Sequence, residues 1–397
     1  MVDLMNAFGD DLHDVLRTAA LAGPLAHSPE TGVVIALRHA DVDALGRDTR
    51  MQGVGLGNFD IIGVTHGPLR DWYGALMFTN EGAVHRRLRS LVQKAFTPRS
   101  VAAIRVAAAE MAGEAYAPVR AQGGGDLVAA SLTLPLRVIC RLIGVPDADV
   151  EGFVGWADSL SVVFGFASPE QIEAATIGLA KLNEYVDELL EARRAAPGDD
   201  LVSALLVAEV DGERLTHDEV RTMVGNLIVG GHDTTGSQLG CTFLTLLRNP
   251  EQAALLAAQP GLLAHAVEET MRFEPSIPGI PRTAVEAITV GGEELPAGTI
   301  VILSTAAANR ETGVWTDPDA FDITRFAQPG APRLMSFGIG THYCLGAALA
   351  RMTLEEATRA LFVDGPAPEA ADTDLEHVVW RQVLGRSPSS LPVTVAV

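Results

Sequence analysis

Cys344 lies in a glycine-rich run that extends from Phe337 to Gly346, directly before a predicted helix over residues 347–362. A thiolate at this position is stabilised by the positive end of the helix dipole and by nearby backbone N–H groups. Gly340 and Gly346 allow the backbone to turn tightly and to approach a flat ligand closely. An isolated cysteine is more often a buried apolar residue. The glycine-rich geometry also suits a heme iron held by one cysteine thiolate.

A second group of residues that could take part in a reaction lies in the predicted helix over residues 217–248, in the run from Gly230 to Thr235. Each glycine inside a helix costs about 1 kcal/mol relative to alanine, so the pair at 230 and 231 needs a reason. It can let a flat ligand or O2 approach the helix backbone, where Thr234 offers a hydroxyl and Asp233 can relay protons. The alternative is a surface acid beside a threonine that bonds back to its own helix. His232 is a conceivable second metal ligand, but we expect no metal there.

An ion pair is predicted between Glu269 and Arg272, which are three residues apart and so share one face of a helix. Most such pairs are exposed and contribute little to stability.

Heme also carries propionate carboxylates, which need cationic or hydrogen-bonding partners. His85 and Arg89 are four residues apart on one face of a helix predicted to continue to Ala95. Arg282 and His342 are further candidates. Any one of these cations, taken alone, can equally be a solvated surface group.

The run around Cys344 resembles the heme-binding loop of the cytochrome P450 family, Phe-x-x-Gly-x-x-x-Cys-x-Gly, at Phe337, Gly340, Cys344 and Gly346. Glu269-Thr270-Met271-Arg272 is similar to the family's Glu-x-x-Arg, and the motifs follow in the family's order over residues 60–397. Two positions depart from the common pattern. The run Glu81-Gly82-Ala83-Val84-His85 replaces Asp-Pro-Pro-x-His, and Gly230 stands where alanine is common.

This resemblance implies heme b (iron protoporphyrin IX) as the cofactor, with the Cys344 thiolate as axial ligand and metal-binding residue. It implies catalytic roles in proton delivery for Asp233 and Thr234. The remaining assignments that it implies are heme contacts by Phe337, Gly338 and Gly346, propionate binding by His85, Arg89, Arg282 and His342, and structural support of the heme loop by a buried cluster of Glu269, Arg272 and Arg325.

By family position, the substrate pocket is expected to be apolar, which suits a lipophilic small molecule. Terpenoid, steroid, polyketide, fatty acid and aromatic substrates all remain open. The candidate pocket residues are Val229, Gly230, Ile277, Pro278, Ile280 and Leu384.

The expected activity is that of a heme-thiolate monooxygenase, which uses O2 and two external electrons to hydroxylate or epoxidise its substrate, in keeping with a role in secondary metabolism. No flavin or nicotinamide motif occurs, so we expect a separate ferredoxin and ferredoxin reductase as electron donors. Two alternatives are a peroxide-driven or non-oxygenating heme-thiolate enzyme and a heme-binding carrier or sensor without turnover. The cations Arg86, Arg87, Lys94 and Arg99 either steer an acidic electron-transfer protein or form an ordinary solvated helix face.

The composition of the chain limits its possible binding partners and its expected location in the cell. The net charge of −21 disfavours nucleic acid and anionic membranes as partners. Residues 1–23 carry four aspartates and no apolar run of spanning length, so neither a signal peptide nor a membrane anchor is expected. The three cysteines Cys140, Cys241 and Cys344 are widely spaced, which fits a reducing cytoplasm. We expect a cytoplasmic monomer.

The elements that must position these residues are mostly helices. Helical spacing extends over residues 101–121, 171–195 and 217–248, and Thr216 with Glu219 forms a predicted capping box at the start of the last one. Strand signals are short and few, at residues 33–37, 288–290 and 300–304. The fold class expected is a mostly α, single-domain cytochrome P450 fold with small peripheral β-sheets. It spans residues 1–397, with a helix-rich core over 80–397 and a weakly diagnostic part over 1–60.

Overall fold

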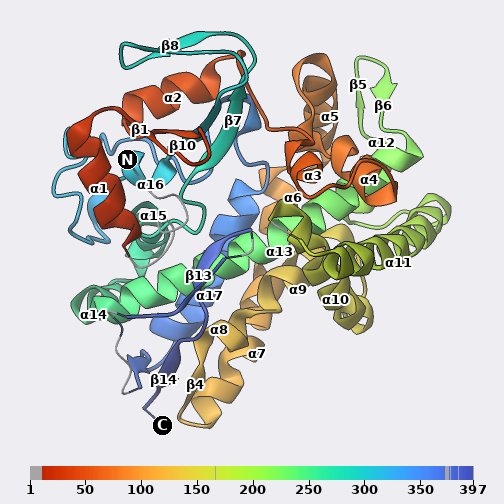
Figure 1. Ribbon diagram of the computed structural model, residues 1–397. Helices are drawn as coiled ribbons and strands as arrows, with labels where there is room; N and C mark the ends of the chain where they lie inside the picture. Colours follow the sequence, from red (N-terminus) through yellow and green to blue (C-terminus); the bar gives the residue numbers. More distant parts are fainter. Residues whose placement is uncertain (1–10, 166, 372–374, 376, 383, 397) are drawn as a thin grey trace.

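The computed structural model describes residues 11–165, 167–371, 375, 377–382 and 384–396 (Figure 1). The expectation about residues 1–23 therefore falls partly on residues 1–10, which lie outside the described residues. Among the helices that are described, none combines the length and apolar character that a membrane span requires.

Helices make up most of the molecule. The first half of the chain contains α1 (Leu12–Ala22), α2 (His39–Arg47), α3 (Gly57–Ile61), α4 (Pro68–Ala75), α5 (Gly82–Ala95), α6 (Pro98–Ala103), α7 (Arg105–Ala121), α8 (Leu127–Ser131), α9 (Leu134–Ile143), α10 (Val150–Ser161) and α11 (Pro169–Ala195). The second half contains α12 (Leu201–Val207), α13 (His217–Arg248), α14 (Pro250–Ala258), α15 (Leu263–Phe273), α16 (Thr305–Ala308) and α17 (Ala347–Phe362).

The largest sheet lies beside α1 and α2, on one side of the helical body (Figure 1). Its strand order is β1 (Leu25–His27), β2 (Val34–Ala36), β10 (Ile300–Leu303), β7 (Ile280–Ala284) and β3 (Met51–Gln52). Only the β2–β10 pair is parallel, with Ile35 opposite Ile302. Smaller sheets join β11 (Glu369–Ala370), β14 (Pro392–Thr394) and β4 (Gly124–Asp126), and pair β12 (Trp380–Gln382) with β13 (Arg386–Pro388), β5 (Glu209–Val210) with β6 (Glu213–Arg214), and β8 (Ile288–Val290) with β9 (Glu293–Leu295).

Helix α13 crosses the centre of the molecule and packs against α9, α15, α17 and β13 (Figure 1). Its apolar residues are buried from Val220 to Leu246 and belong to the main hydrophobic core. The helix begins at a complete capping box, in which the Thr216 hydroxyl accepts from the N–H of Glu219 and the Glu219 carboxylate accepts from the N–H of Thr216. A helix buried over this length can hold side chains at fixed points along a cavity.

The predicted bounds agree with the structure where local signals are strong. The helices over 217–248 and 347–362 are confirmed residue for residue, and so is the strand over 288–290. The helix predicted over 101–121 is divided at Ile104 into α6, which begins at a capping box between Thr97 and Ser100, and α7. The strand predicted over 300–304 ends at Leu303, since Ser304 instead caps α16 through its hydroxyl.

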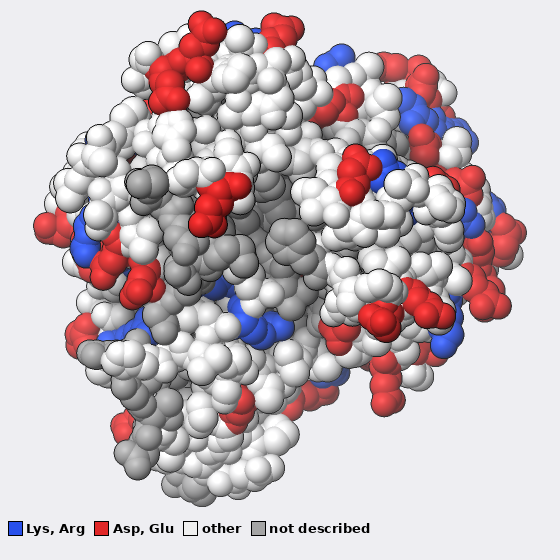
Figure 2. Space-filling view, viewed as in Figure 1, with Lys and Arg blue, Asp and Glu red and all other residues white. Residues whose placement is uncertain are grey.

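Acidic residues dominate the charge of the surface. Asp and Glu number 50 against 29 Lys and Arg. Figure 2 shows the acidic side chains spread over the visible face and not gathered in one patch.

Candidate active site

The loop that carries Cys344 (residues 337–346, called the cysteine loop below) is held in a tight conformation that depends on its glycines. The N–H of Cys344 donates to the carbonyl of Phe337 at 2.9 Å and thereby closes the loop. Gly338 and Gly340 have φ angles of 77° and 71°, a region that side chains other than glycine rarely adopt. A Cβ atom on Gly340 would lie 2.1 Å from the carbonyl oxygen of Gly46. Both glycines are therefore needed to bring the cysteine to the start of α17.

Cys344 is exposed to a cavity inside the protein. Its deep position raises the pKa of the thiol. The N–H of Gly346 and the guanidinium groups of Arg89 and Arg351 act in the opposite direction and favour the thiolate. The cysteine thus combines access from the cavity with donors that stabilise a negatively charged sulfur.

The cavity has a volume of about 340 Å³ and extends from the cysteine loop to α13. Of the predicted pocket residues, Gly230, Ile277 and Ile280 line it, together with Thr234 and the predicted heme-contact residues Phe337, Gly338 and Gly346. Val229, Pro278 and Leu384 are not among the lining residues. Val229 is packed in the core, while Leu384 contacts Asp233 through its backbone.

The Thr234 hydroxyl donates to the carbonyl of Gly230 at 2.6 Å and also faces the cavity. The bond to its own helix, considered above as an alternative to a catalytic role, is thus present in a residue that lines the site. A Cβ on Gly230 would meet no heavy atom within 4 Å. The helix wall is therefore open at this position, so a ligand can approach its backbone.

Asp233 is buried, with only 8% of its surface exposed. One carboxylate oxygen accepts from the N–H groups of Leu384 at 3.1 Å and Gly385 at 2.9 Å. Nη1 of Arg381 lies 3.8 Å from the other oxygen. The turn between β12 and β13 therefore fixes the carboxylate and links it to a partly exposed cation. This clamp was not anticipated from the sequence, because it joins residues about 150 positions apart.

His85 and His342 stack at the cavity wall, with ring centroids 4.2 Å apart. His85 is buried, and its Nε2 atom has no hydrogen-bond partner in the described part of the protein. Burial, aided by His342 and Arg89, lowers the pKa of His85 to about 4. His342 instead bonds to the carboxylate of Glu81 at 2.9 Å. Glu81, noted above only as a departure from the common pattern, therefore positions one of the predicted propionate ligands.

Arg89 and Arg282 also line the cavity. Arg89 donates to the carbonyl of Tyr343 at 2.6 Å, and Arg282 donates only to the carbonyl of the neighbouring Pro281. Neither forms an ion pair within the described residues. Burial lowers the pKa of both guanidinium groups, because it disfavours their positive charge. An anionic partner in the cavity would stabilise that charge. Together with the unpartnered nitrogen of His85, this donor set fits the carboxylates of a heme.

Behind the cysteine loop, Glu269 and Arg272 are fully buried and form a two-point ion pair at 2.7 and 2.8 Å. Arg325 donates to the same carboxylate at 3.1 Å. Arg272 also donates to the carbonyl of Asn309 at 3.0 Å. The Asn309 side chain then holds Ser336 and the N–H of Met335. The structure thus brings the three charged residues together and connects them through Asn309 to the residues directly before the loop.

Two further residues singled out in the sequence have ordinary partners. Nε2 of His232 contacts the Asp158 carboxylate at 3.0 Å. Arg87 pairs with Glu213 and Glu219 and so joins α5 to the start of α13.

A buried charged network at Glu274 was not anticipated. The Glu274 carboxylate pairs with the buried Arg386 and contacts Nε2 of His13 at 3.2 Å. Despite burial, these neighbours and Arg310 lower the pKa of Glu274. Sequence spacing gives no signal for such a cluster, because its members come from distant parts of the chain.

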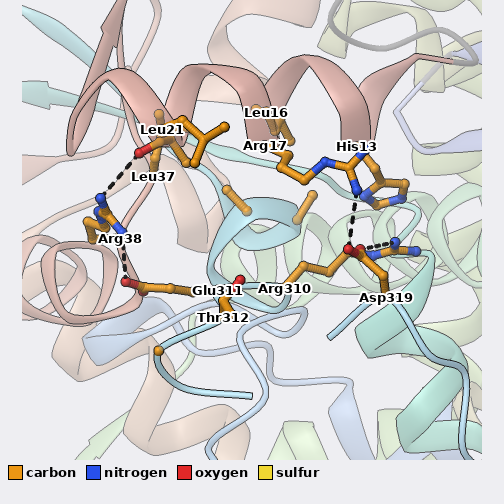
Figure 3. Close-up of a pocket in the computed structure, with 14 residues that line it drawn as sticks. His13, Leu16, Arg17, Leu21, Leu37, Arg38, Arg310, Glu311, Thr312 and Asp319 are labelled. Carbon is orange, nitrogen blue, oxygen red and sulfur yellow. Dashed lines mark hydrogen bonds and ion pairs between the residues drawn. The ribbon is translucent and has the colours of Figure 1, made fainter. Parts of the chain in front are cut away.

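A second cavity, of about 280 Å³, lies between α1 and the segment after α16 (Figure 3). Its charged groups bond mainly to one another. Arg17 and Arg310 each lie 3.2 Å from Asp319, and Arg38 lies 3.3 Å from Glu311. Because these cations already have carboxylate partners, this cavity offers no ligand-binding group comparable to His85 or Arg282.

The sequence and the fold of this chain are similar to those of known proteins. A family model described as Cytochrome P450 matches residues 167–361. The chain is 39% identical over 315 residues to the vitamin D(3) 25-hydroxylase of Pseudonocardia autotrophica, covering 78% of this chain and 75% of that one. It is 42% identical over 281 residues to the cyclomarin C epoxidase CymV of Salinispora arenicola, covering 70% of each. The crystal structure of CalO2 superimposes with a TM-score of 0.90 at 29% identity, over 99% of this chain and 98% of that one.

Proposed function

We propose a set of residue roles and a substrate class for this chain from the premise that it belongs to the cytochrome P450 family. The chain is a monooxygenase of that family, whose members bind heme through a cysteine thiolate. We assign the axial thiolate to Cys344. Heme bound there supplies the binding and cleavage of O2.

The observation that supports this proposal is the set of residues that line one cavity. Cys344 faces it from the loop, Thr234 faces it from α13, and His85, Arg89 and Arg282 line it without carboxylate partners. Thiolate and cations are the two features that heme b needs from a protein, one for its iron and the other for its propionates. In this proposal His342 binds a propionate while Glu81 orients its ring.

Asp233 and Thr234 are proposed to deliver protons. The N–H groups of Leu384 and Gly385 hold the Asp233 carboxylate in place. Arg381, which is partly exposed, connects it toward solvent. Thr234 must release its hydrogen bond to the Gly230 carbonyl before its hydroxyl can donate into the cavity. The open helix wall at Gly230 gives room for that change.

The proposed substrate is a lipophilic small molecule that is hydroxylated or epoxidised. Apolar side chains form much of the cavity wall, including Phe78, Ile139, Leu227, Ile277 and Ile280. The printed names of two relatives, a hydroxylase and an epoxidase, support insertion of one oxygen atom. A role in secondary metabolism belongs to the same proposal.

Electrons are proposed to come from a separate ferredoxin and its reductase, with the protein acting as a cytoplasmic monomer. The exposed cations Arg86, Lys94 and Arg99 support this idea, because they lie on or next to α5 and have no ion-pair partner within the described residues. Arg89 of the same helix contacts the cysteine loop. Arg87 is excluded from this docking surface by its two glutamate partners.

The test of the proposed function is the replacement Cys344→Ser. A thiolate ligand gives a distinctive absorption band for the reduced carbon monoxide complex, and this variant is expected to lose both that band and all oxygenation. Cys241→Ser is the matched control, since Cys241 is buried and donates only to the Arg386 carbonyl at 3.3 Å. A normal thiolate band in Cys344→Ser would show that the ligand is another residue.

A further inference from the structure

The cavity contains few polar side chains that are free to meet a substrate. Gln238 uses both ends of its amide, on the N–H of Ser276 and the carbonyl of Glu274. The hydroxyls of Ser276 and Ser336 donate to backbone carbonyls. The hydrogen-bonding capacity of these side chains is therefore largely used within the protein, and little of it is available to a ligand.

Asn226 differs from these residues. Asn226 lines the cavity, and its side-chain amide forms no hydrogen bond within the described residues. On α13 only Thr235 shares both properties among the polar residues of the cavity wall. An amide carries both a donor and an acceptor, and leaving them unpaired against an apolar ligand costs free energy. A substrate with a matching polar group would recover that cost.

The position of Asn226 on the helix defines the geometry of such a contact. The wall residues Asn226, Gly230 and Thr234 follow at intervals of four and so lie along one side of α13. The Cα atoms of Asn226 and Thr234 are about 12 Å apart along the helix axis. A group anchored at Asn226 would therefore lie within about two helical turns of the carbon that faces Thr234.

The distribution of charge along the cavity wall limits the kind of substrate group that Asn226 can bind. The cationic side chains of the cavity are Arg89 and Arg282, which belong to α5 and β7, and the two histidines His85 and His342 lie with them at the side of α5 and the cysteine loop. The neighbour of Asn226 along the wall is the apolar Leu227, and Ile139 covers the same helix at Gly231. A carboxylate would lose its hydration there without gaining a cation. A hydroxyl or a carbonyl needs only the amide.

We propose that Asn226 hydrogen-bonds an uncharged hydroxyl or carbonyl group of an otherwise apolar substrate and so determines which carbon is presented for oxidation. This inference rests on the proposed function, because it assumes that the substrate occupies the same cavity as the heme. Asn226 acts here as a specificity-determining residue and takes no part in proton transfer.

Ligands that bind heme iron through their own nitrogen provide the test. N-alkylimidazoles would be titrated into the ferric holoenzyme and followed by the shift of its main absorption band. Each tail length would be supplied with a methyl, a hydroxyl or a carboxylate end. At the tail length that reaches Asn226, the change Asn226→Leu is expected to weaken hydroxyl binding relative to methyl binding by roughly threefold to tenfold.

The controls separate this inference from its premise. Thr222→Val removes a polar group from the same helix one turn earlier, outside the cavity wall, and should leave the hydroxyl-to-methyl ratio unchanged. An unchanged ratio in Asn226→Leu at every tail length, or tightest wild-type binding by the carboxylate tail, would overturn the inference while the proposed function stands. No spectral shift with any imidazole in the wild-type protein would overturn both.

Discussion

Behind the cysteine loop, the Glu269 carboxylate accepts hydrogen bonds from Arg272, Arg325 and the N–H of Asp322. In front of the loop, the cavity wall contains polar groups that form no hydrogen bond within the described residues, namely Nε2 of His85 and the side-chain amide of Asn226. The first region is charged yet saturated with internal bonds. The second is mainly apolar yet keeps a few groups free.

The difference follows from what each region must do. A buried ion pair is tolerated only if every donor and acceptor is satisfied, because its desolvation is otherwise uncompensated. Unsatisfied groups at the cavity wall carry a cost that a ligand can repay on binding. Changes behind the loop should therefore act mainly on stability, and changes in the wall mainly on binding and turnover.

The largest effect is expected from breaking the saturated region. Arg272→Ala leaves the Glu269 carboxylate buried without its main partner and should lower the free energy of unfolding by about 3–5 kcal/mol, with loss of heme. Chemical unfolding of the purified holoenzyme, with heme content measured in parallel, checks this. Arg17→Ala removes an exposed arginine with two surface partners and is expected to change stability by less than about 1 kcal/mol. Equal stability of the two variants would contradict the contrast.

A smaller effect, with a pH signature, is expected at Glu274. Its pKa in the folded protein lies below the ordinary value of 4.5, so its charge stabilises the fold above pH 4.5 and this contribution is lost as the pH falls below that value. Glu274→Gln should cost about 2 kcal/mol at neutral pH. Unfolding measured from pH 7 to 3.5 should also show a shallower acid decline than in the wild type. An identical acid decline would show that other groups control it.

In the cavity wall, Thr234→Ala is expected to leave folding intact and to reduce the product formed per electron by about tenfold, which corresponds to about 1.4 kcal/mol. The physical reason is the loss of the only hydroxyl proposed to donate protons beside Gly230. O2 that has taken up two electrons and two protons would then leave as hydrogen peroxide, without product. Reductant consumption, peroxide and product are measured together. Thr222→Ala, on the same helix, serves as the control. Unchanged coupling in Thr234→Ala would exclude its role in proton delivery.

The smallest effect is expected at Gly230. Gly230→Ala places a methyl group in open space and should stabilise α13 by up to about 1 kcal/mol while weakening the binding of bulky ligands a few-fold. The neighbouring Gly231→Ala instead meets Ile139 at 3.4 Å and serves as the comparison. Thermal unfolding and ligand titration distinguish the two. Weaker stability without any change in binding would place Gly230 in the packed core.

Features encoded by neighbouring residues could be predicted from the sequence. The bounds of α13 follow from a capping box and from Asn249-Pro250, and those of α17 follow from the glycine-rich run before it. Glu269 and Arg272 pair because residues three apart share a helix face. The motif around Cys344 likewise indicated heme-thiolate chemistry.

Contacts between distant segments were decided only by the tertiary structure. Asp233 meets the turn at Leu384, Glu81 meets His342, and Asn309 joins the buried ion pair to the cysteine loop. Packing also decided that Leu384 serves this clamp and is not among the lining residues of the cavity, and that Asn226 lines the cavity with no side-chain hydrogen bond to any other described residue. Local spacing encodes periodicity and capping, whereas these pairings depend on how helices and hairpins pack in three dimensions, which no short pattern of residues specifies.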